Sequence, residues 1–146
     1  MMAAPAACSK CANMLVAASH GHVECAKALL AGGADANYAG RKGNDLPIHL
    51  AANNGFVPIL ELLLQNGANI NAQNKKKKNT PLHRASMQGK VDAVGWLLAH
   101  GAAASLQITN KKGQTPEQAA TDPKHSRHVK AELVSAVVKL LQAAGQ

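Results

Sequence analysis

The hydrophobic and polar positions of this chain follow one pattern that occurs three times at intervals of 34 residues. A short Ala-rich segment is followed by a glycine, then by a segment that starts with valine and ends in Leu-Leu, and then by Gly-Ala. The positions in register are Gly21, Gly55 and Gly89; Val23, Val57 and Val91; Leu29-Leu30, Leu63-Leu64 and Leu97-Leu98; and Gly33-Ala34, Gly67-Ala68 and Gly101-Ala102. A period in this range predicts a solenoid, in which each unit stacks on its neighbours.

Each unit carries the signals of two short helices. Thr80-Pro81 opens the first one, because threonine caps helix N-termini well and proline fits the first helical position. We expect this helix to end near Gly89 and a second helix to cover 91–99, with Gly101 as the left-handed residue that follows it. The polar segment after each Gly-Ala, rich in Gly, Asn and Lys, predicts a turn or hairpin.

Two motifs connect this pattern to a known family. Residues 80–85 read T-P-L-H-R-A and residues 46–52 read L-P-I-H-L-A-A, while 67–71 read G-A-N-I-N. The chain resembles the ankyrin-repeat family in these motifs over nearly its whole length. The resemblance implies an all-α solenoid of antiparallel helix pairs with projecting β-hairpin or turn fingers. Its motif residues, expected to be structural, are Pro47, His49, Gly55, Gly67, Thr80, Pro81, His83, Gly89, Gly101, Thr115 and Pro116.

We expect one domain over residues 1–146, divided into units at about 9–40, 41–74, 75–110 and 111–146. The first and last units depart from the pattern, as capping repeats do. In the last unit, Thr115 and Gln118 can form a capping box. A polar loop over 122–127 is longer than the repeat allows. The final helix then carries one apolar stripe over 133–141 and places Lys130, Glu132 and Lys139 on the opposite face.

Composition narrows the class of protein. The chain has 146 residues, 47% of them hydrophobic but only 2% aromatic, which favours one helical domain with a core of small and aliphatic side chains. No apolar run is long enough to span a membrane. Nucleotide-binding loops, zinc-protease motifs, nucleophile elbows and paired carboxylates are missing from the sequence, so we expect no enzymatic activity and no cofactor.

The three cysteines lie near the N-terminus, at Cys8, Cys11 and Cys25. An odd number of cysteines in one segment does not suit a disulfide scaffold, so we expect reduced thiols and a cytoplasmic location. With His20 and His22 they could ligate Zn²⁺. The ligands fall along a predicted helix pair, however, and not on tight turns, so small apolar packing is the preferred interpretation and no metal is expected.

Half of the basic residues occupy the same position within successive repeats. Arg41-Lys42, Lys75-Lys76-Lys77-Lys78 and Lys111-Lys112 all lie where units join, and they hold eight of the sixteen basic residues in a chain of net charge +8. Stacked units would bring these tips into one row. The row either binds an acidic surface in a salt-dependent way or only keeps the protein soluble. Lys75 to Lys78 also resembles a nuclear-import signal, which would add the nucleus as a location.

The first helices and the fingers together form the concave face expected to bind a partner. Besides the basic row, the expected partner-binding residues are polar or exposed ones: Tyr38, Asn53, Asn54, Arg84, Met87 and Gln88. His49 and His83 are in register and are expected to hydrogen-bond within the scaffold, not to do chemistry.

The resemblance implies a function in binding a protein partner, without catalysis. From the charge we expect that partner to present an acidic surface, and we expect a monomer that does not bind membranes. Two alternatives remain: binding of nucleic acid or another polyanion through the basic row, and a role as a small regulatory subunit or inhibitor of a larger complex.

Overall fold

The computed structural model describes residues 13–39 and 44–145, and these residues form helices and turns without any strand. The elements in chain order are α1 (Met14–His20), α2 (Val23–Ala31), α3 (Pro47–Asn54), α4 (Val57–Gln65), α5 (Pro81–Met87), α6 (Val91–Ala99), the 3-10 helix η2 (Ala102–Gln107), α7 (Pro116–Thr121), α8 (Pro123–Ser126) and α9 (Ala131–Ala144). The expected all-α class is therefore confirmed for this part of the chain.

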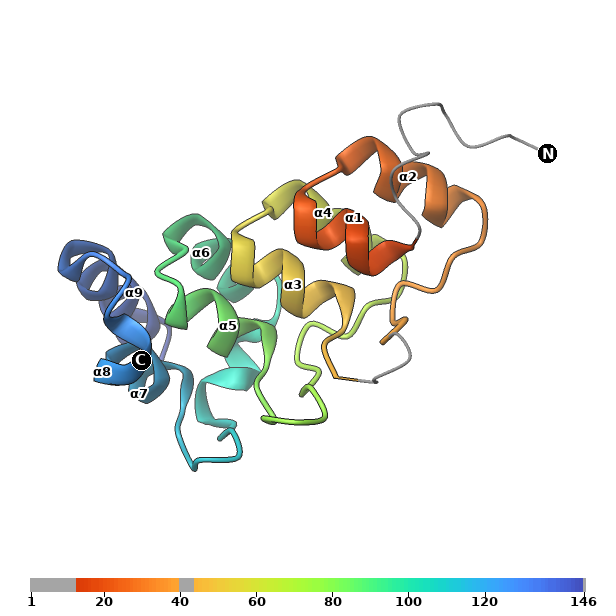
Figure 1. Ribbon diagram of the computed structural model, residues 1–146. Coiled ribbons are helices and arrows are strands. Elements are labelled where there is room, and N and C mark those ends of the chain that lie inside the picture. The colour runs from red at the N-terminus through yellow and green to blue at the C-terminus, as the bar shows by residue number, and fades with distance from the viewer. Residues whose placement is uncertain (1–12, 40–43, 146) are drawn as a thin grey trace.

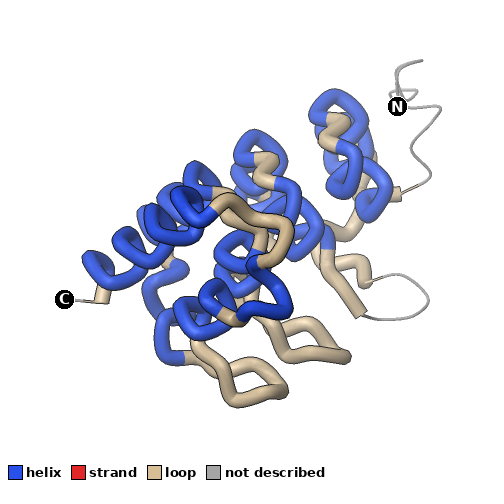
Figure 2. Tube along the Cα trace, turned by 60° about the vertical axis from the view of Figure 1, so that its left-hand side comes forward, coloured by secondary structure: helices blue, strands red, loops and turns tan. Residues whose placement is uncertain are grey.

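The helices form two layers of a short solenoid (Figure 1). The inner layer consists of α1, α3, α5 and α7, each packed on the next, and the outer layer of α2, α4, α6 and α9. The described parts of the connections from the outer layer to the next inner helix project to one side as fingers (Figure 2). We number them in chain order: the first finger lies between α2 and α3, the second between α4 and α5, and the third between η2 and α7.

The sequence signals explain where the helices begin and end. The hydroxyl of Thr80 accepts a hydrogen bond from the backbone N–H of His83, and Pro81 occupies the first helical position of α5. Thr115 caps α7 in the same way, and Gln118 completes the predicted capping box. Helix α6 covers the predicted range, Val91–Ala99. The turn residue Gly89 has a φ of +65°, a conformation that costs glycine little.

Small residues let the inner helices approach one another closely. The small residues of this layer that are fully buried are Ala17, Ala18, Ala51, Ala52, Ala85, Ser86, Ala119 and Ala120. Larger side chains fill the space towards the outer layer, among them Ile59, Leu60, Leu63, Val94 and Leu97. Because alanine adds little volume, neighbouring helices pack at short range, and the core forms one continuous cluster along the solenoid.

The fingers are turns in the described residues, one of the two forms that the sequence predicted. Two other expectations about local structure are wrong. The segment after Gly101 is a 3-10 helix before it becomes a finger. The insertion over 122–127 is not an open loop, because Pro123–Ser126 form one helical turn, α8, capped by the side chain of Asp122.

Helix α9 closes the C-terminal end of the solenoid against α6 and α7. Val137 and Leu141 of its predicted stripe are buried, and Lys130, Glu132 and Lys139 face solvent as expected. Leu133 departs from the stripe, since it is 40% exposed. The cap packs against the turn after α5: a Cβ on Gly89 would lie 2.4 Å from Cγ1 of Val129. Glycine is therefore required here for space as well as for backbone conformation.

Candidate functional site

The second finger is a closed turn that presents four lysines. The N–H of Asn74 donates to the carbonyl of Asn79 at 2.9 Å, and the N–H of Lys78 donates to the carbonyl of Asn74 at 3.0 Å. The Asn74 side chain accepts a third bond from the N–H of Asn79, at 2.9 Å. Lys78 adopts a left-handed φ of +57°, which turns the chain back. The four side chains of Lys75 to Lys78 are exposed around this turn.

The third finger uses the same construction. The N–H of Asn110 donates to the carbonyl of Gln114 at 2.9 Å, and the side-chain oxygen of Asn110 accepts from the N–H groups of Lys112 and Gln114 at 3.0 and 3.1 Å. An asparagine therefore holds the base of the second and of the third finger, directly before the lysines. Because these bonds fix the backbone, the exposed Lys111 and Lys112 start from defined positions.

Hydrogen bonds join the fingers to one another. The N–H of Lys111 donates to the carbonyl of Lys77 at 2.8 Å, so the tips of the second and third fingers are in direct contact. The side chain of Asn110 also donates to the side-chain oxygen of Asn79, at 3.1 Å. On the other side, the backbone N–H of Lys76 donates to the side chain of Asn44 at 3.2 Å. The tips therefore form one connected row, and we call Lys75–Lys78 with Lys111 and Lys112 the finger row.

The two in-register histidines anchor the fingers. His83 accepts a hydrogen bond from the N–H of Thr80 at Nδ1 (3.1 Å), and its Nε2 lies 2.9 Å from the carbonyl of Gln114 in the third finger. His49 does the same for the second finger, since its Nε2 lies 2.8 Å from the carbonyl of Ala72. Both rings are buried, and this burial lowers the pKa of each below the ordinary value of 6.5. Both rings are therefore neutral at pH 7, which suits side chains that hold the scaffold together by hydrogen bonds.

The acidic groups nearest to the finger row are already engaged. Asp45 accepts a hydrogen bond from the side chain of Asn74 at 2.7 Å and pairs with Arg84 at 3.7 Å. Within residues 13–39 and 44–145, the ion pairs are Lys27–Glu24, Arg84–Asp45 and His125–Asp122. No ion pair in this part of the chain involves the finger row, so its six ammonium groups are available to another molecule.

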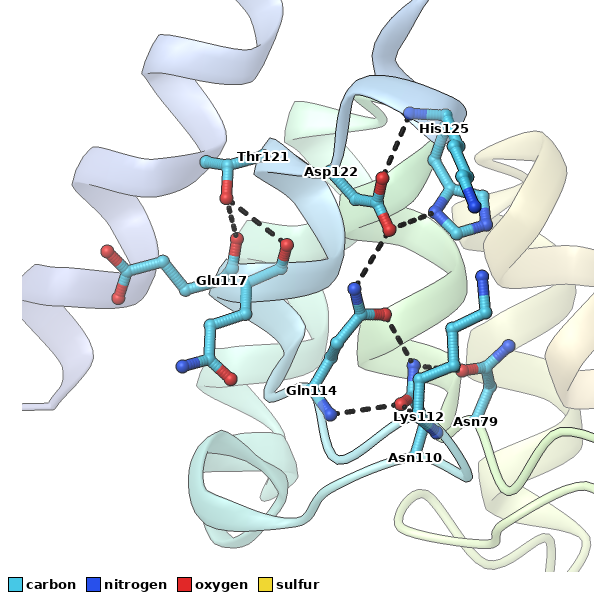
Figure 3. A network of polar contacts seen from close by, with 10 residues as sticks. Asn79, Asn110, Lys112, Gln114, Glu117, Thr121, Asp122 and His125 are labelled. Carbon is cyan, nitrogen blue, oxygen red and sulfur yellow. Dashed lines mark hydrogen bonds and ion pairs between the residues drawn. The ribbon is translucent and has the colours of Figure 1, made fainter.

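A polar network links the third finger to the insertion that follows α7 (Figure 3). The side chain of Gln114 donates to Oδ2 of Asp122 at 2.9 Å, and the N–H of Lys124 donates to Oδ1 at 2.9 Å. These two hydrogen bonds, the first above all, lower the pKa of Asp122 below its ordinary value. Nδ1 of His125 lies 3.6 Å from Oδ2 of the same carboxylate. The insertion is thus fastened to the base of the finger.

The structure corrects the concave-face prediction at Met87 and at Asn54. Met87 does not point outward: it is only 6% exposed, at the end of a helix, α5, that packs between α3 and α7. Gln88 is exposed, as predicted, whereas Asn53 and Asn54 are half-buried. The Asn54 amide donates to the carbonyl of Ser19 at 3.2 Å, so this residue ties α3 to α1. Asn54 is therefore part of the scaffold.

The first finger is described in part. Tyr38 is 40% exposed, and Asp35 shapes the turn before it by accepting from the N–H of Asn37 at 2.9 Å. Arg41 and Lys42 lie outside the described residues, as do Cys8 and Cys11. In the part that is described, no group of three or more His, Cys, Asp or Glu side chains is placed to hold a metal ion. No described helix is long and apolar enough to cross a bilayer.

Sequence reasoning missed the residues that build the fingers. Asn74, Asn110, Gln114 and Asp122 make most of the bonds described above, yet none of them belongs to the motifs that the sequence singled out. One signal was present: an asparagine stands immediately before the lysines in both units, as Asn74-Lys75 and Asn110-Lys111. Asparagine favours such positions because its side chain accepts hydrogen bonds from backbone N–H groups in turns.

Comparison with known proteins agrees with this architecture. A family model described as Ankyrin repeats (3 copies) matches residues 7–74 and 48–140 of the chain. Together the two matches cover most of the sequence, including the inner helices, the second and third fingers and the insertion. A search of curated proteins gave no match.

Proposed function

The chain belongs to the ankyrin-repeat family, and from this premise we propose that it binds an acidic protein partner through the finger row and the neighbouring concave face. Ankyrin repeats are generally protein–protein interaction modules without enzymatic activity. The observation that carries the proposal is the set of six exposed lysines on hydrogen-bonded fingers, none of which makes an ion pair in the described part of the chain. Tyr38, Arg84 and Gln88 are proposed to contribute contacts beside the row.

Physical reasons favour a binding role for the row over a purely solubilising one. Six like charges on two adjacent turns repel one another, and one lysine on each turn would already discourage aggregation. The backbone bonds between fingers hold the charges together, so part of the ordering cost of binding is met before the partner arrives. An acidic surface would gain from this arrangement mainly in association rate and in specificity, and salt would weaken the effect.

Nucleic acid is the second candidate, because a basic row is also an electrostatic footprint for phosphates. Base recognition in single strands relies on aromatic side chains on which bases stack. The second and third fingers carry none, and Tyr38 is the only aromatic residue in the first finger. Binding of nucleic acid would therefore rest on charge alone, without sequence preference. A regulatory subunit or inhibitor would use the same surface as a protein-binding module.

A pull-down with a matched pair of variants tests the proposal. The first variant changes Lys75, Lys76 and Lys77 to Ser, and the second changes Lys27, Lys130 and Lys139 to Ser, which removes the same charge from other exposed positions. At about 0.15 M salt and after nuclease treatment, we expect the wild type and the second variant to retain a discrete protein that the first variant loses. Equal retention by both variants, or loss of all retention with nuclease, would overturn the proposal.

The same variants address location and assembly. We propose that the protein is a monomer and is located in the cytoplasm. If Lys75–Lys78 act as a nuclear-import signal, the first variant should shift a fluorescent fusion out of the nucleus and the second should not. Identical nuclear fractions for both variants would contradict a role of Lys75–Lys78 in nuclear import.

For assembly, we expect the purified wild type to sediment at the mass of a monomer.

A further inference from the structure

The insertion between α7 and α9 extends the basic surface beyond the repeat pattern. Helix α8 carries Lys124 and is fastened to the third finger through Asp122 and Gln114, whose contact measures 2.9 Å. Arg127 follows at the end of α8 and is exposed. Because this connection fixes the insertion against the finger, its basic groups continue the row towards the C-terminal cap.

Lysines from three separate turns act electrostatically on His125. Lys124 precedes it in α8, Lys112 extends from the third finger towards the imidazole ring (Figure 3), and Lys77 belongs to the second finger, whose tip is bonded to Lys111. Partial burial lowers the pKa of His125 below 6.5, Asp122 acts in the opposite direction, and the charges of the three lysines lower the pKa further. The turns that carry the three lysines are fastened together by hydrogen bonds, from the N–H of Lys111 to the carbonyl of Lys77 and from the side chain of Gln114 to Asp122.

His125 itself has an unfilled hydrogen-bonding position. Its Nδ1 is buried and makes no hydrogen bond, although Oδ2 of Asp122 lies only 3.6 Å away. A proton on this nitrogen would face the carboxylate and satisfy it. A neutral ring that carries its proton on Nε2 leaves Nδ1 unsatisfied, whereas the imidazolium has a proton on both nitrogens. The imidazole is therefore held between a carboxylate that favours its charged form and three ammonium groups, with partial burial, that oppose it.

We propose that Lys77, Lys112 and Lys124 around His125 form the end anchor of the partner-binding surface, which takes a carboxylate group of an acidic protein segment and binds it with uptake of a proton by His125. This inference rests on the proposed function and assigns that function a position and a pH dependence. A bound carboxylate neutralises the lysine charges that disfavour the imidazolium, and so the charged ring and the anion stabilise each other.

The use of lysine at all three anchor positions favours a flexible acidic segment as the ligand over a single anionic group that must be bound in one fixed geometry. Lysine ammonium groups are compact point charges, whereas arginine binds a single carboxylate or phosphate through two parallel hydrogen bonds. The three anchor groups are all lysines on exposed turns. They select for charge density along an extended run of Asp and Glu, and the half-buried histidine adds one position that responds to pH.

The sign of the pH effect follows from linkage. His125 is neutral at pH 7 in the free protein, because its pKa lies below 6.5. A bound anion raises this pKa, so the complex holds more protons than the free protein, and affinity increases as the pH falls. Each unit by which binding raises the pKa gives about a tenfold gain in affinity once the pH is below both values.

Titration of the full chain with an oligo-aspartate peptide at low salt tests the anchor. Between about pH 7.5 and about pH 5.5 the aspartates remain ionised, and we expect wild-type affinity to increase about three- to tenfold. His125→Gln should remove this increase, while His20→Gln, a change at an exposed residue at the other end of the solenoid, should keep it. Lys112→Gln with Lys124→Gln should weaken binding at both pH values, and Lys130→Gln with Lys139→Gln should weaken it much less.

The outcomes separate this inference from the proposed function. An unchanged pH dependence in His125→Gln, or no binding of the peptide at all, would overturn the anchor even if the Lys75–Lys77 variant still fails to retain the cellular partner. Retention of that partner by the Lys75–Lys77 variant would overturn the proposed function instead. Tighter binding of a single-stranded DNA oligonucleotide of equal charge would overturn the assignment of a carboxylate-bearing partner.

Discussion

The Nε2 atom of His83 lies 2.9 Å from the backbone carbonyl oxygen of Gln114, a residue of the next finger. The ring is oriented for this bond by Thr80, whose N–H and hydroxyl both lie within hydrogen-bond distance of Nδ1. One side chain therefore links the start of α5 to the base of the third finger. This link makes the position of the finger depend on the repeat before it.

Replacement of His83 by alanine should destabilise the fold without removing a binding contact. The change leaves the carbonyl of Gln114 and the N–H of Thr80 without their partner and opens a cavity at a fully buried site. We expect a loss of about 2–4 kcal/mol in the free energy of unfolding, measured by denaturant titration. His128→Ala, at an exposed position, should change it by less than about 0.5 kcal/mol. Similar values for both variants would contradict the role of His83.

Stability should fall as the pH decreases towards 5. Burial lowers the pKa of His49 and of His83 below 6.5 in the folded state, so the unfolded chain binds protons more readily. The stabilisation is complete above the ordinary value of 6.5 and is lost as the pH falls through the folded values. Protonation would also be opposed locally, because a proton on Nδ1 of His49 would face the N–H of Leu46 and a proton on Nδ1 of His83 would face the N–H of Thr80. Thermal melts at constant salt should show a flat Tm above about pH 7 and a decreasing Tm from about pH 6.5 to pH 5.

The buried hydroxyl of Ser86 should cost stability. Ser86 stands where the other units have Ala18 and Ala52, and its Oγ is buried without a hydrogen-bond partner. Ser86→Ala should therefore stabilise the protein by about 1 kcal/mol, measured by denaturant titration. Ser105→Ala is the matched control with the opposite sign, because the buried hydroxyl of Ser105 donates to the side chain of Asn71. Destabilisation by both changes would show that Ser86 has a partner in solution.

The two turn glycines Gly89 and Gly67 should differ in their tolerance of alanine. Both have positive φ, +65° and +91°, so alanine is strained at either position. At Gly67 nothing lies within 4 Å of an added Cβ, and we expect a loss of about 1–2 kcal/mol. At Gly89 the Cβ would also collide with Val129, so the loss should be larger and should loosen the C-terminal cap. Proteolysis near residue 129 would report that loosening, and equal losses at the two glycines would contradict it.

Local signals of the sequence were sufficient for the scaffold. The 34-residue spacing, the Thr-Pro helix starts and the glycines after each helix placed α5 and α6 correctly. Met87 shows where such reasoning failed. Its position in the repeat suggested an outward direction, but the exposure of a side chain depends on which helices pack beside it, and α7 follows α5 closely in space. The helical turn α8 escaped prediction because it interrupts the period and depends on a single cap, Asp122.

The sequence by itself determined the repeat, the helix pairs and the phase at which the basic residues fall, because these depend on interactions within a few residues of the chain. Only the tertiary structure decided that the lysine turns touch, through the bond from Lys111 to Lys77, and that Gln114 of the third finger meets Asp122 of the insertion. These contacts join separate turns of the chain, and their formation depends on how the units stack. Spacing along the sequence specifies which residues share a phase, whereas the packing of the helices specifies the distances between them.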